Sequence, residues 1–213
     1  SVLLVCLNDA DTGEPLAIMS ANLLSAMRTG CVPGVATKYL ARKNAKTLGI
    51  VGCGVMNKAC SRAILENLPG GGKVYIYDIV RRNAEKFASE LSKDYRLEMV
   101  VAESLEAAIS DSDVVSIAAS GAIAVKVEKD WLKKGCLFTI TGHVDLEDSC
   151  YIENKLVFDD WKMHKAWLEE GLMHEKGIMS ISKWVPSYQI LKLHDDGLLP
   201  DDRMFSLGDV VFG

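Results

Sequence analysis

Two glycines spaced by one residue form the most chemically informative feature of the sequence. The run Thr47–Val51 leads directly into Gly52-Cys53-Gly54, and a helical pattern follows. At such a strand-to-helix turn the first glycine permits the tight turn, and the second lets the backbone approach a pyrophosphate held at the helix N-terminus. The third position of this fingerprint holds Asn57, where Gly or Ala is usual. The turn predicts a phosphate-binding loop with contacts from Gly52, Gly54, Val55 and Met56.

A carboxylate follows the next predicted strand, Lys73–Tyr77. Asp78 stands close to where a dinucleotide site carries the acid that binds the adenine ribose, which accepts hydrogen bonds from NAD and repels the 2′-phosphate of NADP. Arg81 and Arg82 follow, and a guanidinium there accommodates NADP. We predict NAD as the cofactor and leave NADP open. The alternative is that the glycines only make a tight turn and that Asp78 caps the following helix.

Small residues stand at the end of the predicted strand Val114–Ala118. Ala118, Ala119 and Ser120 lie at its carboxyl-terminal edge, which is where a ligand binds across an open α/β sheet. Small side chains leave room for a flat cofactor, so all three are predicted cofactor contacts. The alternative is that they are small in order to pack against a neighbouring helix.

Short apolar runs alternate with amphipathic segments from Thr47 onward. The predicted strands are Leu48–Val51, Val74–Tyr77, Met99–Ala102, Val114–Ala118, Leu137–Thr141 and Lys155–Phe158. The predicted helices are Lys58–Leu68, Arg82–Lys93, Leu105–Ser110, Lys162–Glu170 and Ser187–Asp195. Because the strands are apolar throughout, the pattern predicts an α/β fold with a Rossmann-type, doubly wound parallel sheet covered on both faces.

The residues before Thr47 have a different texture. Leu3–Leu7 and Pro15–Met19 flank a turn-rich loop and predict a hairpin. A helix is predicted from an N-cap at Ser20 to Cys31, and a second from Gly34 to Lys46 after a break at Pro33.

Composition limits the function classes. The chain of 213 residues is 49% hydrophobic and 25% charged, as in ordinary globular proteins. A net charge of −5 lacks the basic footprint of nucleic-acid or anionic-membrane binding, and no apolar run reaches the roughly 18–20 residues of a membrane span. Six cysteines without a CxxC pair predict reduced thiols packed as small hydrophobes, no metal site and a cytoplasmic location. We take the start at Ser1 as a sign of a fragment.

Several segments carry a family likeness. Arg28–Ala41, followed by Lys46–Val55, resembles the ornithine cyclodeaminase/mu-crystallin family, as do Ser112–Val115, the Gly142 turn and Ser206–Gly213. A typical member is longer at both ends. The resemblance implies that residues 1–46 belong to a substrate and dimerisation domain of α+β type, of which only remnants are present. It also implies that residues 47–185 form the dinucleotide-binding domain and that residues 186–213 form a helical return segment.

The resemblance also implies a substrate site on the first helix. By it, Arg28 corresponds to the arginine that binds the substrate carboxylate, and Thr29 to a neighbour near the nicotinamide. A guanidinium suits this role because it offers a bidentate fork to a carboxylate. Without the resemblance, a solvated or salt-bridged helix arginine is the simpler interpretation.

The turn Thr141–Asp145 departs from the family pattern. In the cyclodeaminases this turn carries a catalytic aspartate where His143 stands here. His143 is a candidate proton donor or acceptor because histidine titrates near neutral pH. Asp145, supplied from a shifted backbone, is the alternative carboxylate. Loss of the ancestral chemistry is a third interpretation.

These residues together predict an NAD(P)-dependent oxidoreductase acting on an amino acid or its imine. An amino-acid or opine dehydrogenase or a ketimine reductase is favoured by His143, and the alternatives are an ornithine cyclodeaminase-type lyase and a non-catalytic nucleotide-binding subunit. The expected partners are an amino acid, imine or 2-oxo acid and a second copy in a homodimer. A second polypeptide that supplies a missing amino-terminal region is a further expectation.

Overall fold

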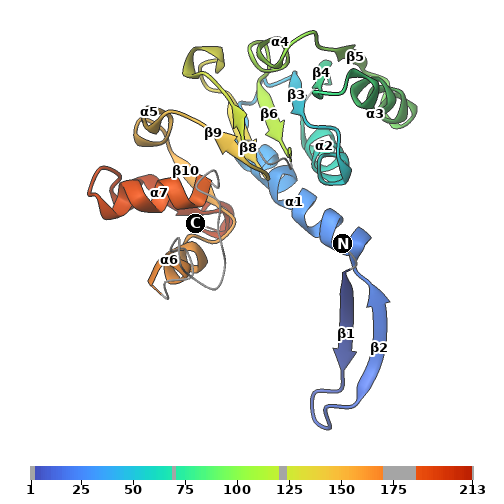
Figure 1. Ribbon diagram of the computed structural model, residues 1–213, viewed down its shortest axis with the longest axis vertical. Helices are drawn as coiled ribbons and strands as arrows, with labels where there is room; N and C mark the ends of the chain where they lie inside the picture. The colour runs from blue at the N-terminus through green and yellow to red at the C-terminus, as the bar shows by residue number, and fades with distance from the viewer. Residues whose placement is uncertain (1–2, 69–70, 120–123, 170–185, 213) are drawn as a thin grey trace.

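A five-stranded parallel sheet forms the centre of the computed structural model, which describes residues 3–68, 71–119, 124–169 and 186–212 (Figure 1). Its strands are β3 (Leu48–Val51), β4 (Lys73–Tyr77), β5 (Glu98–Val101), β6 (Val114–Ile117) and β8 (Leu137–Ile140). They lie in the order β5-β4-β3-β6-β8, and each neighbouring pair is parallel. The chain reverses its direction of winding between β3 and β6, so the carboxyl ends of these strands mark the switch point where ligands bind in open α/β sheets.

The sheet is covered on both faces, which confirms the predicted Rossmann-type fold. One apolar core joins the sheet to α2 (Val55–Asn67) and α3 (Arg81–Asp94) and includes Ile50, Ile64 and Phe87. A second core on the other face includes Val51 and Val115, together with Ile109 of α4 (Leu105–Ile109). Alternate residues of β3 therefore enter different cores, as the pleat of a strand requires.

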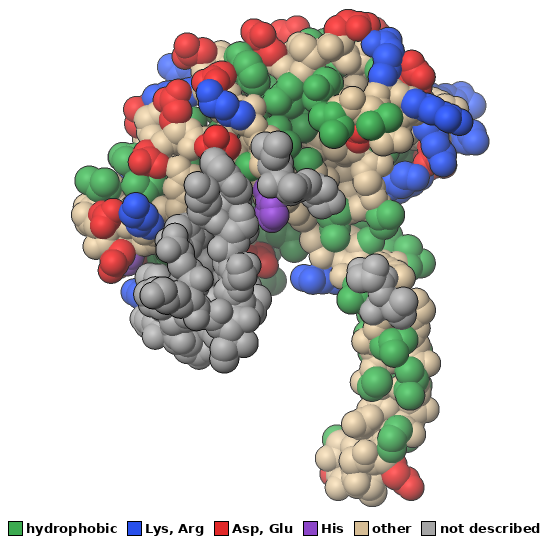
Figure 2. Space-filling model, in the orientation of Figure 1, with side chains coloured by type: hydrophobic (Ala, Val, Ile, Leu, Met, Phe, Trp, Pro, Cys, Tyr) green, Lys and Arg blue, Asp and Glu red, His purple; other side chains and the backbone are tan. Residues whose placement is uncertain are grey.

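The predicted amino-terminal hairpin is confirmed. It consists of β1 (Leu4–Asn8) and β2 (Pro15–Ser20), paired antiparallel, and it projects away from the body as an arm (Figures 1 and 2). Its turn is closed by Asp9, whose Oδ1 accepts hydrogen bonds from the backbone N–H groups of Asp11 and Thr12. Apolar side chains line the arm in Figure 2, and Leu4 and Ile18 are 62% and 67% exposed.

The predicted break at Pro33 is wrong, because α1 (Asn22–Leu40) runs through it as one helix. Pro33 lies inside the helix and lacks the N–H that would close one helical hydrogen bond, which normally disfavours this position. The close contact of α1 with α2 explains the unbroken helix, because a Cβ on Gly30 would lie 2.7 Å from the Cβ of Ala59. The predicted cap at Ser20 is also wrong, since the N-cap residue is Ala21 and no side chain caps the helix.

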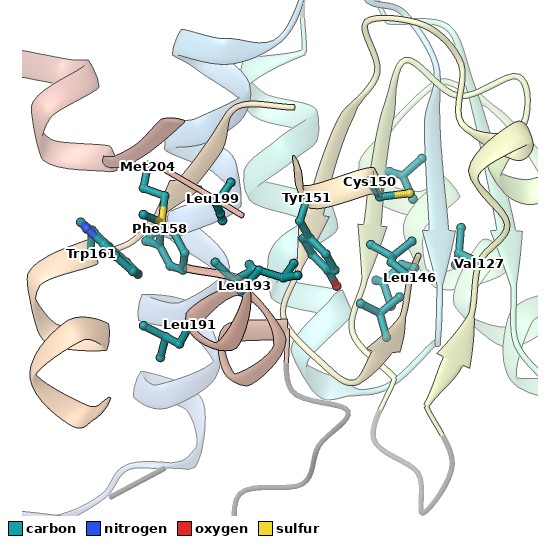
Figure 3. Close-up of a cluster of buried hydrophobic side chains, with 14 of the residues drawn as sticks. Val127, Leu146, Cys150, Tyr151, Phe158, Trp161, Leu191, Leu193, Leu199 and Met204 are labelled. Carbon is teal, nitrogen blue, oxygen red and sulfur yellow. The ribbon is translucent and has the colours of Figure 1, made fainter. Parts of the chain in front are cut away.

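The carboxyl-terminal part closes the second core, shown in Figure 3. Its elements and the short strands before them are β7 (Val125–Lys126), β9 (Val144–Asp145), α5 (Asp148–Ile152), β10 (Leu156–Phe158), α6 (Trp161–Glu169), α7 (Pro186–Asp195), β11 (Met204–Ser206) and α8 (Leu207–Phe212), with single 3-10 turns at Lys129–Trp131 and Asp201–Arg203. The helices α6 and α7 confirm the predictions for this region. The placement of Lys155–Phe158 in the parallel sheet is wrong, because β10 pairs in parallel with β11 in a separate two-stranded sheet.

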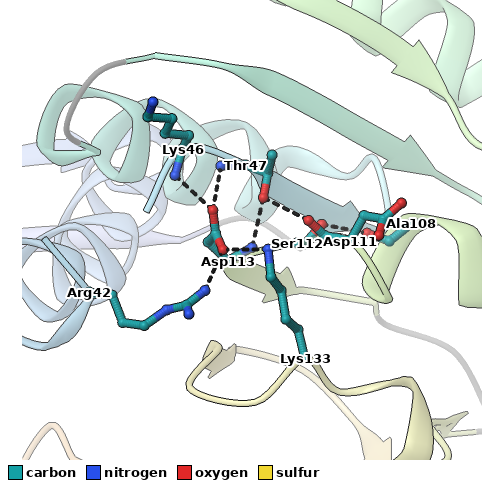
Figure 4. A network of polar contacts seen from close by, with 8 residues as sticks. All are labelled: Arg42, Lys46, Thr47, Ala108, Asp111, Ser112, Asp113 and Lys133. Atoms are coloured by element: carbon teal, nitrogen blue, oxygen red, sulfur yellow. Dashed lines mark hydrogen bonds and ion pairs between the residues drawn. The ribbon is translucent and has the colours of Figure 1, made fainter. Parts of the chain in front are cut away.

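An ion-pair network fastens the amino end of the central sheet (Figure 4). The nearly buried carboxylate of Asp113 accepts hydrogen bonds from Arg42 at 2.5 Å and Lys133 at 2.8 Å, and from the backbone N–H groups of Lys46 and Thr47 at 2.8 and 3.2 Å. Burial alone would raise the pKa of Asp113, but Lys133 and the two backbone donors hold it well below its usual range. The network ties the residues before β3 to those before β6 and β8.

Cysteine placement corrects one detail. All six cysteines are free thiols, but Cys6 and Cys31 are exposed rather than packed as small hydrophobes. Within the described ranges no helix is long and apolar enough to cross a membrane. The same residues contain no cluster of three or more His, Cys, Asp or Glu side chains arranged to hold a metal ion.

Candidate functional site

The turn after β3 forms an open cradle. Gly52 has a φ of 88°, and its N–H donates to the Tyr77 carbonyl at 2.9 Å. A Cβ at Gly52 would lie 3.0 Å from the Ala118 carbonyl oxygen, whereas a Cβ at Gly54 would meet no atom within 4 Å. Gly54 is the N-cap residue of α2 and offers no side-chain cap. The space around Gly54 at the start of α2 is therefore free, and the first N–H groups of the helix have no side-chain cap. This geometry fits the pyrophosphate of a dinucleotide.

Asp78 lies beside this cradle at the end of β4. Its Oδ2 accepts a hydrogen bond from the Cys53 N–H at 2.9 Å, and its Oδ1 accepts from the Val80 N–H at 2.9 Å and from the Asn83 amide at 3.3 Å. Val80 is the N-cap residue of α3, so the same carboxylate supports the start of that helix. A carboxylate has about four acceptor positions, which leaves room for a ribose hydroxyl.

A shallow cleft opens next to Asp78 at the carboxyl ends of β4 and β5. It is lined by Tyr77, Asp78, Ile79, Arg81, Ala84, Val101, Ala102 and Glu103. Its mixed apolar and charged wall suits a flat base joined to a ribose. Sequence reasoning missed Ile79 and Ala102, although Ile79 comes two residues after one predicted strand and Ala102 is the last residue of another.

The two arginines near Asp78 differ in their ion pairs. Arg81 pairs with Glu85 at 3.1 Å and with Glu103 at 2.9 Å. Arg82 is exposed and forms no ion pair with any residue that the structure describes. Of the two, Arg82 is the guanidinium available to a ligand.

Cys53 stands between the two glycines but is not activated. Burial, together with the negative charge of Asp78, raises the pKa of its thiol to about 12 although Lys58 opposes the shift. The thiol is therefore protonated at neutral pH and is not a nucleophile.

Three strand ends meet at the switch point. A Cβ on Gly142 would lie 2.5 Å from the Ala119 carbonyl oxygen, and the backbone N–H of His143 donates to that oxygen at 3.3 Å. Ala118, in turn, is the residue that limits the space at Gly52. The predicted contacts Ala118 and Ala119 thus lie between the phosphate cradle and His143. The predicted contact Ser120 lies outside the described residues.

Close helix packing determines where Arg28 and Thr29 stand. Gly30 meets Ala59, and Gly34 meets Ala63 one turn further along both helices, so α1 and α2 run in parallel. Arg28 and Thr29 therefore lie near the level of the first turn of α2. Arg28 is exposed and has no hydrogen bond or ion pair with the described part of the chain. The small residues at four-residue spacing were a signal for this contact that sequence reasoning did not use.

His143 and Asp145 lie on either side of a buried residue. Val144 and Leu146 enter the second core, so the alternation of the strand directs Asp145 away from it, toward the side of His143. Both side chains are half-buried, and neither has a side-chain hydrogen bond to a described residue. The backbone of β9 is held by β7, where the Val125 N–H donates to the His143 carbonyl at 3.2 Å.

The model of the ornithine cyclodeaminase/mu-crystallin family matches residues 1–213. The chain belongs to this family. It is 31% identical over 159 residues to the N-((2S)-2-amino-2-carboxyethyl)-L-glutamate dehydrogenase of Staphylococcus aureus, covering 74% of this chain and 47% of that protein. It is 32% identical over 138 residues to the ketimine reductase mu-crystallin of Rattus norvegicus, covering 65% of this chain and 42% of that protein.

A solved structure of similar fold is the Thermococcus litoralis Delta(1)-pyrroline-2-carboxylate reductase in complex with NADH and L-proline. It is 31% identical, has a TM-score of 0.76 and is matched over 99% of this chain and 60% of that one. The chain therefore spans about half the length of the curated relatives it matches. The resemblance predicted from Arg28–Ala41 and Lys46–Val55 is confirmed.

Proposed function

We propose that the protein is an NAD-dependent oxidoreductase that transfers hydride at the carbon next to the carboxylate of an amino acid or its imine. The observation that carries the proposal is the open cradle at Gly54, with Asp78 directly beside it. The relatives named above are dehydrogenases and reductases, which supports the reaction class.

The nucleotide is held by backbone and small side chains. The N–H groups of Val55 and Met56 bind the pyrophosphate, because they are unpaired in the first turn of α2. Asp78 accepts the ribose hydroxyls and disfavours a 2′-phosphate, while Arg82 is the residue that would tolerate NADP. The small side chains of Ala118 and Ala119 leave room for the nicotinamide, which when bound supplies or accepts the hydride. Ser120 remains a predicted contact outside the described residues.

The substrate is held from α1. Arg28 binds its carboxylate, since an exposed guanidinium with no protein partner is free to form a bidentate pair. Thr29 lies beside it, near the nicotinamide. Because α1 and α2 run in parallel, both residues lie near the level of the first turn of α2.

Proton transfer is assigned to the turn after β8. His143 exchanges a proton with the nitrogen or oxygen substituent on the reacting carbon, and its backbone contact with Ala119 keeps it near the nicotinamide position. Asp145 lies on the same side of the strand and is the alternative group for this proton transfer.

The hairpin arm supports assembly into a homodimer. Leu4 and Ile18 belong to one face and Val5 and Met19 to the other, so both faces of the arm carry apolar side chains. A two-stranded hairpin is marginal by itself, and such faces require a cover. We propose that a second copy of this protein covers the apolar faces of the arm. A second, different polypeptide is the alternative.

The proposed division keeps residues 47–185 as the nucleotide-binding domain, residues 1–46 as part of a substrate and dimerisation domain, and residues 186–213 as a return segment. A cytoplasmic location is proposed because all six cysteines are free thiols.

Titration of the protein with NADH, followed by nicotinamide fluorescence, tests the cofactor assignment. Tight binding that NADPH does not match is the expected result. Absorbance assays with amino acids, 2-oxo acids plus amines, and cyclic imines then test the reaction. Binding without any turnover across this panel would replace the enzyme assignment with a non-catalytic nucleotide-binding role.

A further inference from the structure

Asn57 is completely buried beneath the phosphate cradle. Its amide donates hydrogen bonds to the Gly52 carbonyl at 2.7 Å and to the Val51 carbonyl at 2.8 Å, and it approaches the Ser116 carbonyl at 3.3 Å. Its Oδ1 accepts a hydrogen bond from the Ser116 hydroxyl at 2.7 Å. The carbonyl contacts fix which way round the amide lies, because carbonyl oxygens only accept, so the amide hydrogens are directed at them and Oδ1 faces the Ser116 hydroxyl.

The Gly52 carbonyl and the Cys53 N–H belong to the same peptide group. Asn57 holds the carbonyl side of this rigid plane, and Asp78 Oδ2 accepts from the N–H side at 2.9 Å. Within the described ranges no other donor reaches the Gly52 carbonyl. A single peptide plane therefore connects the buried Asn57 side chain of α2 to the carboxylate at the end of β4.

Without Asn57 this peptide has little to keep it in place. Gly52 has a φ of 88° and no side chain, so rotation of the plane meets a low steric barrier. An unpaired, partly buried carbonyl would favour such a rotation, because it costs free energy unless it finds another donor. Rotation would remove the Cys53 N–H from Asp78, leaving that carboxylate held only by Val80 and Asn83.

We propose that Asn57 is a positioning residue for nucleotide discrimination. By fixing the Gly52–Cys53 peptide, it holds Asp78 in the orientation that meets the ribose hydroxyls and repels a 2′-phosphate. The inference rests on the proposed role of Asp78 in binding NAD. A Gly or Ala at this place in the fingerprint cannot make these contacts. Asn57 therefore adds hydrogen bonds that favour NAD over NADP.

The test compares dissociation constants for NADH and NADPH in the whole protein. Asn57→Ala keeps a residue that the fingerprint accepts, and it is expected to reduce the preference for NADH about tenfold, the effect of losing one hydrogen bond to a charged group. The ratio of the two constants is the readout, because a general loss of stability lowers both affinities together. Ser61→Ala is the matched control: Ser61 is also buried on α2, but among the described residues its hydroxyl bonds only the Lys58 carbonyl.

Two further variants make the result decisive. Ser116→Ala removes the hydroxyl that donates to Asn57 Oδ1, so the amide is held less firmly and the ratio should shift in the same direction by about twofold. This variant serves if Asn57→Ala does not fold. In an Asp78→Ser background, Asn57→Ala should leave the ratio unchanged, since the two residues act through one path. If Asp78→Ser alone does not lower the preference, the proposed role of Asp78 fails. If it does, while Asn57→Ala and Ser116→Ala keep the parent ratio, only the inference about Asn57 is overturned.

Discussion

The amino end of the central sheet is closed, and its carboxyl end is open. At the amino end, Asp113 receives hydrogen bonds from two cationic side chains and two backbone N–H groups. At the carboxyl end, the first turn of α2 has no side-chain cap, and Arg28 has no partner among the described residues. The two ends belong to the same strands, so they differ in the hydrogen-bonding groups that surround them and not in the sheet itself.

The difference shows which end serves stability and which serves ligands. A carboxylate that accepts four hydrogen bonds lowers the free energy of the folded state and has no acceptor position left for another molecule. Unpaired donors at a helix N-terminus and an exposed guanidinium gain hydrogen bonds only when an anion arrives. Variants at the carboxyl end should therefore change binding and turnover, and variants at the amino end should change stability.

The largest effect is expected from Gly54→Val. A branched side chain would fill the free space above the first turn of α2, so NADH binding should fall below detection while the unfolding temperature stays near that of the parent. Nicotinamide fluorescence and a thermal melt measure the two quantities, and Gly54→Ala should give a smaller loss. Unchanged binding by Gly54→Val would mean that the pyrophosphate lies elsewhere.

His143→Ala should lower turnover by about 10²–10⁴-fold if the imidazole transfers the proton. The affinity for NADH should stay within about twofold, because the backbone contact of His143 with Ala119 survives the substitution. Steady-state rates and a fluorescence titration separate these effects. If His143→Ala keeps the full parent rate, Asp145 becomes the candidate for proton transfer, and Asp145→Asn then tests it.

Arg28→Leu should weaken substrate use at least thirtyfold, because a charge-assisted pair to the substrate carboxylate is typically worth about 2–5 kcal/mol. The matched control is Lys38→Leu, which removes a cation from the last turn of the same helix. Values of kcat/KM for both variants, with NADH affinity as the reference, give the comparison. Equal losses from the two would show a general effect of charge on α1.

The smallest effect should come from Asp113→Asn at the closed end. The substitution removes the charge that Arg42 and Lys133 share and should cost about 1.5 kcal/mol of unfolding free energy at neutral pH, with NADH affinity unchanged. The folded-state pKa of Asp113 lies below its ordinary value of 3.8, so this contribution is complete above that pH and is lost as the pH falls below it. Chemical denaturation of parent and variant at pH 7 and pH 3 should therefore show a smaller gap at the lower pH.

The features that were predicted correctly depend on short stretches of chain. β3, the Gly52–Gly54 turn and Asp78 each follow from a few consecutive residues, because a strand, a turn and a strand end have local signatures. The unbroken helix through Pro33 depends instead on α2 pressing against Gly30 and Gly34, which are far from it in sequence. β10 was assigned to the wrong sheet for a similar reason, since its partner β11 follows in the chain only after α6 and α7.

The site follows the same division. Asn57 appeared as a defect in the fingerprint because its partner Ser116 lies on β6, far along the chain. No residue near the turn indicates that contact. The cleft residues Ile79 and Ala102 become neighbours only when β4 and β5 pair. Positions within one loop could thus be predicted, whereas contacts between loops required the sheet.

The parallel pairing of β10 with β11 also determines the order in which the two cores can form during synthesis. The core under α2 and α3 draws its buried residues from Ala45 to Val114, whereas the core on the opposite face extends from Val51 to Met204. Emerging from the ribosome, the chain can close the first face once β6 is made, but the second face stays bare until β11 follows. A ribosome stalled before Met204 would hold a half-covered sheet, the kind of nascent intermediate that chaperones engage.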